Sequence, residues 1–449
     1  MSTSAPRAMP GPKGTWPFGS FFDEAKDPLG FIQENQRRHG DVFLFRIGGR
    51  LHCVLSHPDD VKRVLIDEAA AFPKPRMPPS LFAGKGLFGS EGDYWKKHRR
   101  MIQPAFQRER LLAWVDTIAD ATRKMLDGWE PLARSGQPVD VYAELLRLAY
   151  TIQARLCLTT EPDAALYESM HGAVKHIGRR DPPMHELVFG VLPFLSSWRQ
   201  RMVGYMKPID AFIHARIAER RRGEGVRPDL LQMLLELKDK DTGEGFTDVE
   251  VRDELMNIWG AGYEATGAGL AWSLLLLDRH PHALERVERE AAEVLSGAPP
   301  TASTAEALTY TGQAFREALR IYPPAWRLER QATQDVEVRG VAVPAGTMLF
   351  MLPYVLHRDA RFWEEPERFD PERFSAERSA GRPKCSYLPF GAGQRTCLGN
   401  LLALLKGPLI LAMVARRYRV TPVSREAPGF DVGVTLAPRG GLPVRLTLR

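Results

Sequence analysis

The chain has 449 residues, of which 44% are hydrophobic and 26% are charged, a balance typical of a globular protein with an ample core. The 61 Lys and Arg residues exceed the 55 Asp and Glu residues, and the net charge of +6 is spread along the chain. Because nucleic-acid binding requires a concentrated basic face, we expect no nucleic-acid partner.

The N-terminal segment and the cysteines indicate a reducing, cytoplasmic setting. Residues 1–12 are small and polar, are expected to be flexible, and lack the roughly 20 apolar residues that a membrane span requires. The four cysteines are widely separated and no secretory signal precedes them, so we expect no disulfide framework. No linker divides the sequence, which predicts one domain over residues 1–449.

The first part of the chain combines short helices with a β-hairpin. Helical spacing predicts helices at residues 28–39 and 58–65, and the run DVFLFRIGGRLHCVL at 41–55 predicts two strands joined at Gly48-Gly49. Residues 72–92 are rich in Pro and Gly, and a loop of this length is often functional. Its apolar residues include Leu81, Phe82, Leu87 and Phe88.

Helical periodicity dominates the middle of the chain. A helix opens at Tyr94, and Trp95 and Arg99 share one of its faces because they are four residues apart. An indole N–H and a guanidinium on one face can hold a carboxylate-bearing ligand, although an amphipathic surface helix is the simpler alternative. Further helices are expected at 111–129, 141–158, 164–177 and 207–222, with an apolar segment at 187–195.

A long helix is predicted from the capping-box sequence at 247–250 to Arg279, with Pro281 just beyond its end. Its middle, residues 255–277, holds a single charged residue, Glu264, among apolar or small side chains. Since no other segment repeats this pattern, it predicts the buried central helix of a large soluble protein rather than a membrane span. A lone buried carboxylate is unfavourable unless it has a partner or a function.

Residues 305–322 predict another helix, which ends at Pro323-Pro324. Glu317 and Arg320 lie three residues apart in it among apolar neighbours, so an exposed ion pair and a buried charge network are both open. Beyond it, short strands are expected at 336–343 and 347–352, and residues 432–436 and 442–448 predict a β-hairpin around Gly440-Gly441.

The sequence FGAGQRTCLG at 390–399 builds a protected cysteine. Two glycines allow backbone conformations that are closed to other residues, and Cys397 precedes an apolar run expected to begin a helix. The N–H groups and dipole at that helix start stabilise a thiolate, and Gly399 leaves room for a flat ligand. The alternative is a buried, inert cysteine. It is disfavoured because six residues of the motif are present together at set spacings: Phe390, Gly391, Gly393, Arg395, Cys397 and Gly399.

This motif resembles the cysteine-ligand loop of the cytochrome P-450 monooxygenases, which are haem-thiolate enzymes. The resemblance extends over essentially the whole chain. It implies a mainly α fold with a minor β region, in which a long central helix lies over the haem and the cysteine loop lies beneath it. It also implies that haem b is bound through Cys397, the proximal thiolate ligand of the iron.

The resemblance implies roles for further residues. Haem contacts are expected from Trp95, Arg99, Ala261, Gly262, Arg330, Phe390, Gly391, Arg395 and Gly399. A buried charge network beneath the cysteine loop is expected from Glu317, Arg320 and Arg373, with Arg368 in the sequence Pro-Glu-Arg-Phe as a rival to Arg373. The substrate pocket is expected to involve residues 187–195 and Leu81, Phe82, Leu87, Phe88, Tyr263, Ala265, Trp326, Leu328 and Leu436.

Two positions depart from the family pattern. Ala265 occupies the usual place of the catalytic hydroxyl, and the hydroxyl appears at Thr266. Either Thr266 and Glu264 organise a water chain for protons, next to space left by Gly262, or a substrate hydroxyl fills the gap at Ala265. Lys406 replaces the usual acid, and we expect it on a basic docking surface with Lys96, Lys97, Arg100, Arg382 and Lys384.

The implied reaction inserts one oxygen atom from O2 into a hydrophobic small molecule, by hydroxylation or epoxidation of a fatty acid, terpenoid, steroid or macrolide-like compound. Electrons are expected from an acidic ferredoxin or flavodoxin with its reductase, and the protein is expected to be a monomer. Two alternatives stay open. Ala265 is consistent with a peroxide-driven reaction or an oxygen-independent rearrangement, and a non-catalytic haem sensor or storage module is disfavoured by Glu264 beside an apolar pocket.

Overall fold

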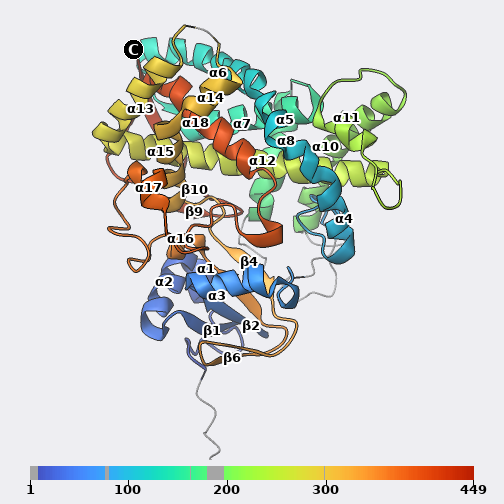
Figure 1. Ribbon diagram of the computed structural model, residues 1–449, viewed down its shortest axis with the longest axis vertical. Coiled ribbons are helices and arrows are strands. Elements are labelled where there is room, and N and C mark those ends of the chain that lie inside the picture. The colour runs from blue at the N-terminus through green and yellow to red at the C-terminus, as the bar shows by residue number, and fades with distance from the viewer. Residues whose placement is uncertain (1–8, 76–79, 162, 179–196, 298) are drawn as a thin grey trace, which may run out of the picture. The chain divides into compact units, whose positions relative to one another are not determined.

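The computed structural model describes residues 9–75, 80–161, 163–178, 197–297 and 299–449, and these residues are mainly helical with a few small sheets (Figure 1). They form two compact units. The first, here called the β-rich unit, comprises the chain up to Pro75 together with residues 320–369 and 376–397. The second, here called the helical unit, comprises residues 76–319, 370–375 and 398–449.

The β-rich unit is built on a four-stranded sheet with the order β1-β2-β7-β4. The predicted hairpin is present: β1 and β2 are antiparallel, and Gly48 at the turn has a φ of 55°, which favours glycine. Strand β7 pairs parallel to β2 and antiparallel to β4, and a separate hairpin joins β5 to β6. The strands are β1 (Val42–Ile47), β2 (Arg50–Leu55), β4 (Leu328–Gln331), β5 (Val336–Val338), β6 (Val341–Val343) and β7 (Met348–Met351).

The β-rich unit also contains short helical elements, of which α2 packs against β1. Helix α2 begins as predicted at Pro28, where the Asp27 side chain accepts a hydrogen bond from the Gly30 N–H and proline needs no N–H partner. The predicted helix at 58–65 divides into α3 and a π-helical turn. The elements are α1 (Phe21–Lys26), α2 (Pro28–His39), α3 (Pro58–Lys62), η1 (Arg63–Asp67), η2 (Ala69–Ala71), α16 (Pro353–Leu356), α17 (Ala376–Ser379) and η5 (Gly393–Arg395).

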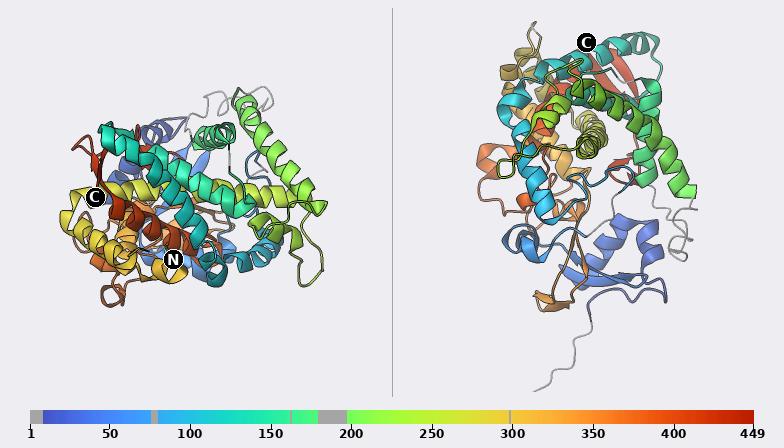
Figure 2. Two further views of the ribbon diagram at one scale, coloured as in Figure 1. Left: turned by 90° about the horizontal axis from the view of Figure 1, so that it is seen from above. Right: turned by 90° about the vertical axis from the view of Figure 1, so that its right-hand side faces the viewer.

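The helical unit is organised around α12 (Asp248–Arg279), which lies among α7, α10 and α18 (Figure 2). Its capping box is present: the Thr247 side chain accepts from the Glu250 N–H, and the Glu250 side chain accepts from the Thr247 N–H. Trp259, Tyr263 and Trp272 are fully buried along it. The prediction of a buried central helix is therefore confirmed.

The helical unit contains many further elements. They are α4 (Gly92–Ile102), η3 (Gln103–Phe106), α5 (Arg108–Leu112), α6 (Val115–Ser135), β3 (Val139–Asp140), α7 (Val141–Leu158), α8 (Ala164–Gly178), α10 (Ser197–Arg221), α11 (Leu230–Glu236), α13 (Pro281–Val294), α14 (Ala302–Ala307), α15 (Thr309–Ile321), η4 (Pro371–Phe374), α18 (Asn400–Arg417), β8 (Tyr418–Pro422), β9 (Phe430–Val432), β10 (Leu436–Pro438) and β11 (Pro443–Leu448). Of these, α11, α13, β8 and β10 also contact α12. Helix α15 ends two residues into the β-rich unit.

Several predicted boundaries differ from the structure. The single helix expected at 305–322 is two helices, α14 and α15, because the chain leaves helical geometry at Leu308. Helix α10 begins ten residues before the expected start at 207, and the helix expected at 111–129 is divided into α5 and α6. The apolar segment 187–195 lies outside the described residues.

The predicted C-terminal hairpin is wrong. Strand β10 pairs with β9 through a turn at 433–435, and β11 pairs instead with β8 and β3 in a different sheet. Both runs have β propensity, but propensity does not choose a partner strand. The choice follows packing, because β11 places Val444 and Leu446 in the core against β8.

None of the helices in the described ranges is both long enough and apolar enough to cross a membrane. Helix α12 has the length, but glycines, aromatic residues with polar groups and Glu264 lie among its apolar side chains.

Candidate functional site

The cysteine loop follows the predicted motif and lies in the β-rich unit. The Cys397 N–H donates to the Phe390 carbonyl oxygen at 2.9 Å, which closes the loop. Gly391 and Gly393 both have a φ of 70°, in the left-handed region. A Cβ at Gly393 would lie 2.0 Å from the Leu65 carbonyl oxygen, so only glycine lets the loop approach η1 this closely. Helix α18 begins at Asn400, three residues after the cysteine.

The exposure of the thiols singles out Cys397. Cys53, Cys157 and Cys385 are buried, and burial raises the pKa of Cys53 to about 12 and that of Cys385 to about 11, which keeps both thiols protonated. Cys397 is exposed, and no atom lies within 4 Å of the position that a Gly399 Cβ would take. An accessible sulfur beside an open helix start suits the thiolate ligand of a flat haem.

The basic and aromatic residues expected at the haem propionates occupy both units. Arg330 in β4 is 8% exposed, and its guanidinium donates to the Glu329 carbonyl oxygen at 2.7 Å. Arg395 lies in η5, two residues before the cysteine. In the helical unit, Trp95 and Arg99 lie one turn apart on α4, as their spacing predicts, and the Trp95 ring is buried.

The charge network around Glu317 is buried rather than exposed. Glu317 accepts a hydrogen bond from the Asp370 N–H at 3.0 Å, and its Oε1 lies 3.3 Å from the Arg373 Nε. Both Glu317 and Arg320 have no exposed surface. The structure therefore brings Arg373 to Glu317, whereas the rival Arg368 forms an exposed ion pair with Glu365.

Arg320 is held in the β-rich unit by backbone carbonyls. Its Nη1 donates to the His357 carbonyl oxygen at 2.7 Å and its Nη2 to the Arg368 carbonyl oxygen at 3.2 Å. The His357 ring in turn accepts at Nε2 from the Leu388 N–H at 2.7 Å, two residues before Phe390. This chain of contacts links the buried guanidinium to the segment that carries the cysteine loop.

The middle of α12 is buried on every side except one. Within residues 251–270, the residues that are not buried are Ile258, Ala261, Gly262, Glu264 and Ala265, and Ala261 among them is exposed. Their spacing of three and four residues places Ile258, Ala261 and Ala265 on one face, here called the accessible strip. Small side chains on an accessible face suit the close approach of a flat ligand and O2, as the resemblance implies for Ala261.

Glu264 is a largely buried carboxyl group that titrates near neutral pH. Burial raises its pKa to about 7 with help from the Asp431 carboxylate, and the Thr435 side chain opposes this rise. The neighbouring Tyr263 is fully buried, with its ring edge-on to Tyr150. A carboxyl group with a pKa near 7 can both take up and release a proton at physiological pH.

The Gly262 carbonyl oxygen is shared by two donors. The Thr266 hydroxyl donates to it at 2.8 Å, and the Lys406 ammonium on α18 donates to it at 2.9 Å. Lys406 is 2% exposed, so the expectation of a surface lysine is wrong. It lies four residues after Leu402 and three before Leu409, on the face of α18 that is buried.

The space expected beside Gly262 is filled, so that expectation is also wrong. A Cβ at Gly262 would lie 1.4 Å from the Gln153 Nε2, which reaches across from α7 and donates to the Ile258 carbonyl oxygen at 3.2 Å. The missing side chain therefore admits a neighbouring amide, and any room for O2 or water belongs to the accessible strip.

The expected pocket residues are distributed over several elements. In the helical unit, Phe82 lies against Gly260, Leu81 and Phe88 are exposed, and the carbonyl of the buried Leu436 accepts from the Trp272 indole at 2.9 Å. In the β-rich unit, Trp326 is buried and Leu328 is partly buried. Sequence reasoning missed the buried polar residues at the start of α12, which are Arg252, Asp253, Glu254 and Asn257. Three of them could have been noticed as charged residues in a helix that is otherwise largely apolar.

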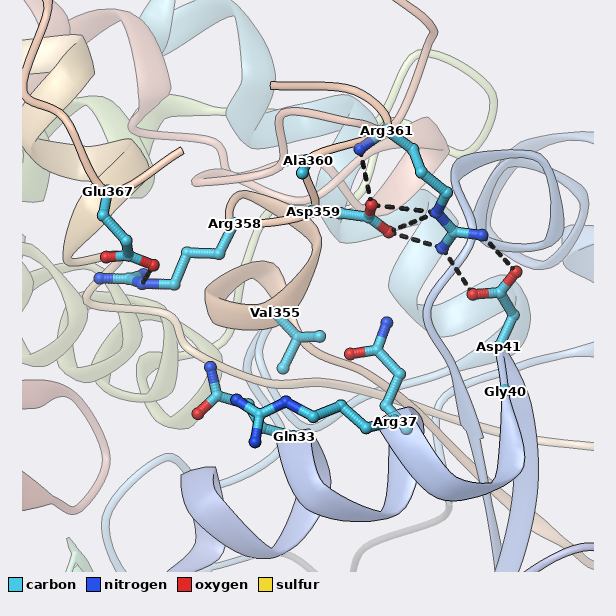
Figure 3. A pocket seen from close by; sticks show the side chains of 11 residues that line it. Gln33, Arg37, Gly40, Asp41, Val355, Arg358, Asp359, Ala360, Arg361 and Glu367 are labelled. Carbon is cyan, nitrogen blue, oxygen red and sulfur yellow. Dashed lines mark hydrogen bonds and ion pairs between the residues drawn. The ribbon is translucent and has the colours of Figure 1, made fainter. Parts of the chain in front are cut away.

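A cavity of about 590 Å³ in the β-rich unit has a different character (Figure 3). Arg361 lies between the carboxylates of Asp41 and Asp359, and Arg358 pairs with Glu367. Because ion pairs line its walls, this cavity does not suit a hydrophobic substrate.

Comparisons with known proteins agree with this geometry. Residues 9–440 match the family model described as cytochrome P450. The chain is 32% identical to cyclooctat-9-en-7-ol 5-monooxygenase of Streptomyces melanosporofaciens, over 94% of this chain and 92% of that protein. It is 30% identical to cyclooctatin synthase of the same organism, over 93% and 92%, and 30% identical to pentalenene oxygenase of Streptomyces avermitilis, over 99% and 96%.

Proposed function

The chain belongs to the cytochrome P450 family of haem b monooxygenases, and from this premise we propose that it inserts one oxygen atom from O2 into a cyclic terpenoid. The observation that carries the substrate class is the near full-length likeness to three Streptomyces proteins. Their names state that they act on cyclooctat-9-en-7-ol or pentalenene, or form cyclooctatin. Among the compounds considered from the sequence, this favours terpenoids over fatty acids, steroids and macrolides.

We infer that Cys397 would be the thiolate ligand that holds the haem iron. Its exposed sulfur, the closed loop at Phe390 and the open start of α18 support this role. Arg330, Arg395, Trp95 and Arg99 would hold the haem propionates, and Glu317, Arg320 and Arg373 would support the loop. When bound, a thiolate-ligated haem supplies the activation of O2, and the thiolate favours O–O cleavage.

We infer that Glu264 and Thr266 handle the protons that this reaction consumes. The Glu264 carboxyl has a pKa near neutral, so it can deliver a proton and be recharged at physiological pH. The Thr266 hydroxyl donates its hydrogen bond to the Gly262 carbonyl oxygen. Its oxygen can still accept a hydrogen bond from a water molecule or a substrate hydroxyl. The competing route, a substrate hydroxyl at Ala265, is supported by the place of Ala265 on the accessible strip.

We propose that an acidic ferredoxin or flavodoxin supplies the electrons, because members of the family use redox partners. Of the expected docking residues, Lys406 is buried, Lys97 pairs with Glu244, and Arg100 pairs with Asp239. Lys96 is exposed but pairs with Asp93 at 3.1 Å, and Lys384 is exposed and remains suitable. The rate of reduction should fall as ionic strength rises and fall further in Lys384→Glu. The monomeric state and the cytoplasmic location stay predictions.

The experiment that tests the proposed reaction uses the haem-loaded protein, a surrogate ferredoxin with its reductase, and four compounds: pentalenene, cyclooctat-9-en-7-ol, lauric acid and progesterone. We expect a cyclic terpenoid to give a substrate-induced absorbance shift and a product with one added oxygen atom. With ¹⁸O2 the product should carry the label. Turnover of lauric acid or progesterone alone would contradict the proposed substrate class.

The peroxide-driven alternative is tested in the same preparation, because Ala265 is its specific support. We expect no labelled product when the reductant is withheld, and product from added hydrogen peroxide at a rate well below that with O2 and reductant. Faster turnover with peroxide than with O2 and reductant would replace the proposed reaction by the alternative.

A further inference from the structure

The cavity of about 590 Å³ in the β-rich unit is lined by two segments of the chain (Figure 3). One is the second half of α2 with the two residues that follow it, and the other runs from α16 to Glu367. The charged residues of the lining are three arginines and three acids: Arg37, Arg358, Arg361, Asp41, Asp359 and Glu367. Polar groups that line a pocket determine which ligand it binds, so the pairing of each arginine indicates the ligand.

Arg361 is occupied by the two aspartates of the lining. Its Nη1 and Nη2 donate to the Asp41 carboxylate at 2.9 and 2.6 Å, and its Nε donates to Asp359 at 3.0 Å. Both aspartates are only partly accessible. A guanidinium bound by two carboxylates is held firmly, so these three side chains form a fixed wall of the cavity and not a group that is available to a ligand.

Arg358 is nearly buried, yet its charge is weakly compensated. Its side chain is 7% exposed, whereas Glu367, its carboxylate partner among the described residues, lies 3.2 Å away and is 71% exposed. The Arg358 Nη1 donates to the Tyr354 carbonyl oxygen at 3.3 Å, and the guanidinium carbon lies 3.9 Å from the centre of the Tyr354 ring. Because a carboxylate that is mostly in water contributes little to a buried charge, a ligand anion can take its place at Arg358.

The backbone that carries Arg358 is fixed before any ligand binds. The preceding residue, His357, has no exposed surface. Its carbonyl oxygen accepts from Arg320 at 2.7 Å, and its ring accepts from the Leu388 N–H at 2.7 Å. A guanidinium held in place by its backbone and by the ring beneath it loses little further freedom on binding, which favours affinity.

The α2 side of the cavity adds a second guanidinium and two free amides. Arg37 is 74% exposed, and its partner Glu34 lies 3.4 Å away and also pairs with Arg38 at 2.7 Å. Arg37 lies in the last turn of α2, where its charge offsets the negative end of the helix dipole. The side-chain amides of Gln33 and Gln36 make no hydrogen bond to another residue that the structure describes. This side can therefore bind both a carboxylate and a group that donates a hydrogen bond.

We propose that this cavity binds a small dicarboxylate that carries a hydroxyl group. One carboxylate of the ligand binds Arg358 and displaces Glu367 into solvent, and the other binds Arg37. The hydroxyl is bound by the amides of Gln33 and Gln36, whose carbonyl oxygens require a donor. Two guanidinium groups nearby disfavour a cationic donor, so the donor is a neutral hydroxyl and not an ammonium. The inference goes beyond the proposed function, because it involves neither the haem nor the oxidised substrate.

The experiment measures binding to the haem-loaded protein by isothermal titration calorimetry at constant ionic strength. Three acids on one carbon skeleton are compared: L-malate carries the hydroxyl, succinate lacks it, and L-aspartate has an ammonium in its place. We expect malate to bind at one site per chain, and succinate and aspartate to bind at least fivefold more weakly. In the double variant Gln33→Met with Gln36→Met, malate and succinate should bind within twofold of each other.

Two variants should move the affinity for malate in opposite directions. Glu367→Gln leaves Arg358 without its own carboxylate, so we expect malate to bind at least threefold more tightly. Arg358→Gln should weaken malate binding at least tenfold. Glu365→Gln and Arg368→Ala are the matched controls, because they make the same changes of charge in an exposed ion pair that does not line the cavity. Both should bind malate within twofold of the parent.

Absence of saturable malate binding would overturn the proposed site. An affinity for malate that is unchanged or weaker in Glu367→Gln would overturn the role of Arg358, and this result does not require Arg358→Gln to fold. Equal affinities for malate, succinate and aspartate would overturn the role of the hydroxyl. The titration requires no turnover, so malate binding as expected would stand even if no terpenoid is oxidised.

Discussion

The ammonium of Lys406 donates to the carbonyl oxygen of Gly262 at 2.9 Å, which joins the helix that follows the cysteine loop to the centre of α12. The same carbonyl accepts the Thr266 hydroxyl at 2.8 Å. Lys406 is almost fully buried, and a buried ammonium is tolerated only where it is well hydrogen-bonded. Lys406 is therefore part of the α12–α18 packing and not of a docking surface.

The stability of a Lys406 variant should depend on how its new side chain interacts with the Gly262 carbonyl oxygen. Lys406→Glu places a carboxylate against the carbonyl oxygen, and we expect it to be less stable than Lys406→Met by at least about 2 kcal/mol, since a buried charge without a donor is costly. Denaturant unfolding of the two variants measures this difference. Equal stability of the two would show that the side chain at 406 does not meet the Gly262 carbonyl in solution.

Cys397→Ser should abolish the red-shifted absorbance band of the carbon monoxide complex, because that band requires a thiolate ligand on the iron. Cys385→Ser is the matched control: Cys385 is a buried thiol in the same unit and should leave the band in place. The reduced, carbon monoxide-treated spectrum of each variant provides the measurement. An unchanged band in Cys397→Ser would require a different iron ligand.

Breaking the buried ion pair between Glu317 and Arg373 should strongly destabilise the protein. Glu317→Ala removes the carboxylate that pairs with the buried Arg373, and breaking a buried ion pair destabilises a protein by roughly 3–5 kcal/mol, so we expect little soluble haem-loaded protein. The control is Arg368→Ala, in the similar Pro-Glu-Arg-Phe sequence five residues earlier. Arg368 pairs with Glu365, and each of these two side chains is 63% exposed. Loss of this ion pair should change the free energy of unfolding by less than about 1 kcal/mol. Similar yields from both variants would mean that the Glu317 pair opens to solvent.

Glu264→Gln should alter how stability depends on pH. Because the pKa of Glu264 is raised to about 7 from an ordinary 4.5, the folded state keeps the proton that the unfolded state loses. The parent therefore loses stability as pH rises between these values, by up to about 3 kcal/mol, whereas the glutamine variant cannot ionise. The stability of Glu264→Gln relative to the parent should thus grow between pH 5 and pH 8, measured by denaturant unfolding. A constant difference would show that the carboxyl group titrates normally.

The proposed proton route is tested by measuring how much of the consumed reductant ends up in hydrogen peroxide. We expect Thr266→Ala and Glu264→Gln each to divert reducing equivalents into hydrogen peroxide, by at least threefold per reductant consumed, and Ala265→Thr to be tolerated. Peroxide yield on one terpenoid substrate across the three variants is the measurement. If both loss variants remain as well coupled as the parent, the substrate hydroxyl at Ala265 becomes the better route.

Local chemistry by itself determined much of this protein. The glycines, cysteine and apolar run of residues 390–399 specify their loop because the conformational needs of each position are met by its own residue and its near neighbours. The capping box at Thr247 set the start of α12 for the same reason, and so did the hairpin at Gly48. The family and its cofactor follow from such local patterns.

Only the tertiary structure decided which distant groups meet. A sequence shows two Pro-Glu-Arg-Phe copies but not that Arg373 reaches Glu317, and it shows Lys406 but not that this lysine faces inward. It shows a glycine at 262 but not the Gln153 amide that fills its space. Helical periodicity indicates that a residue lies on a face, whereas the identity of the element packed against that face depends on contacts between segments more than fifty residues apart.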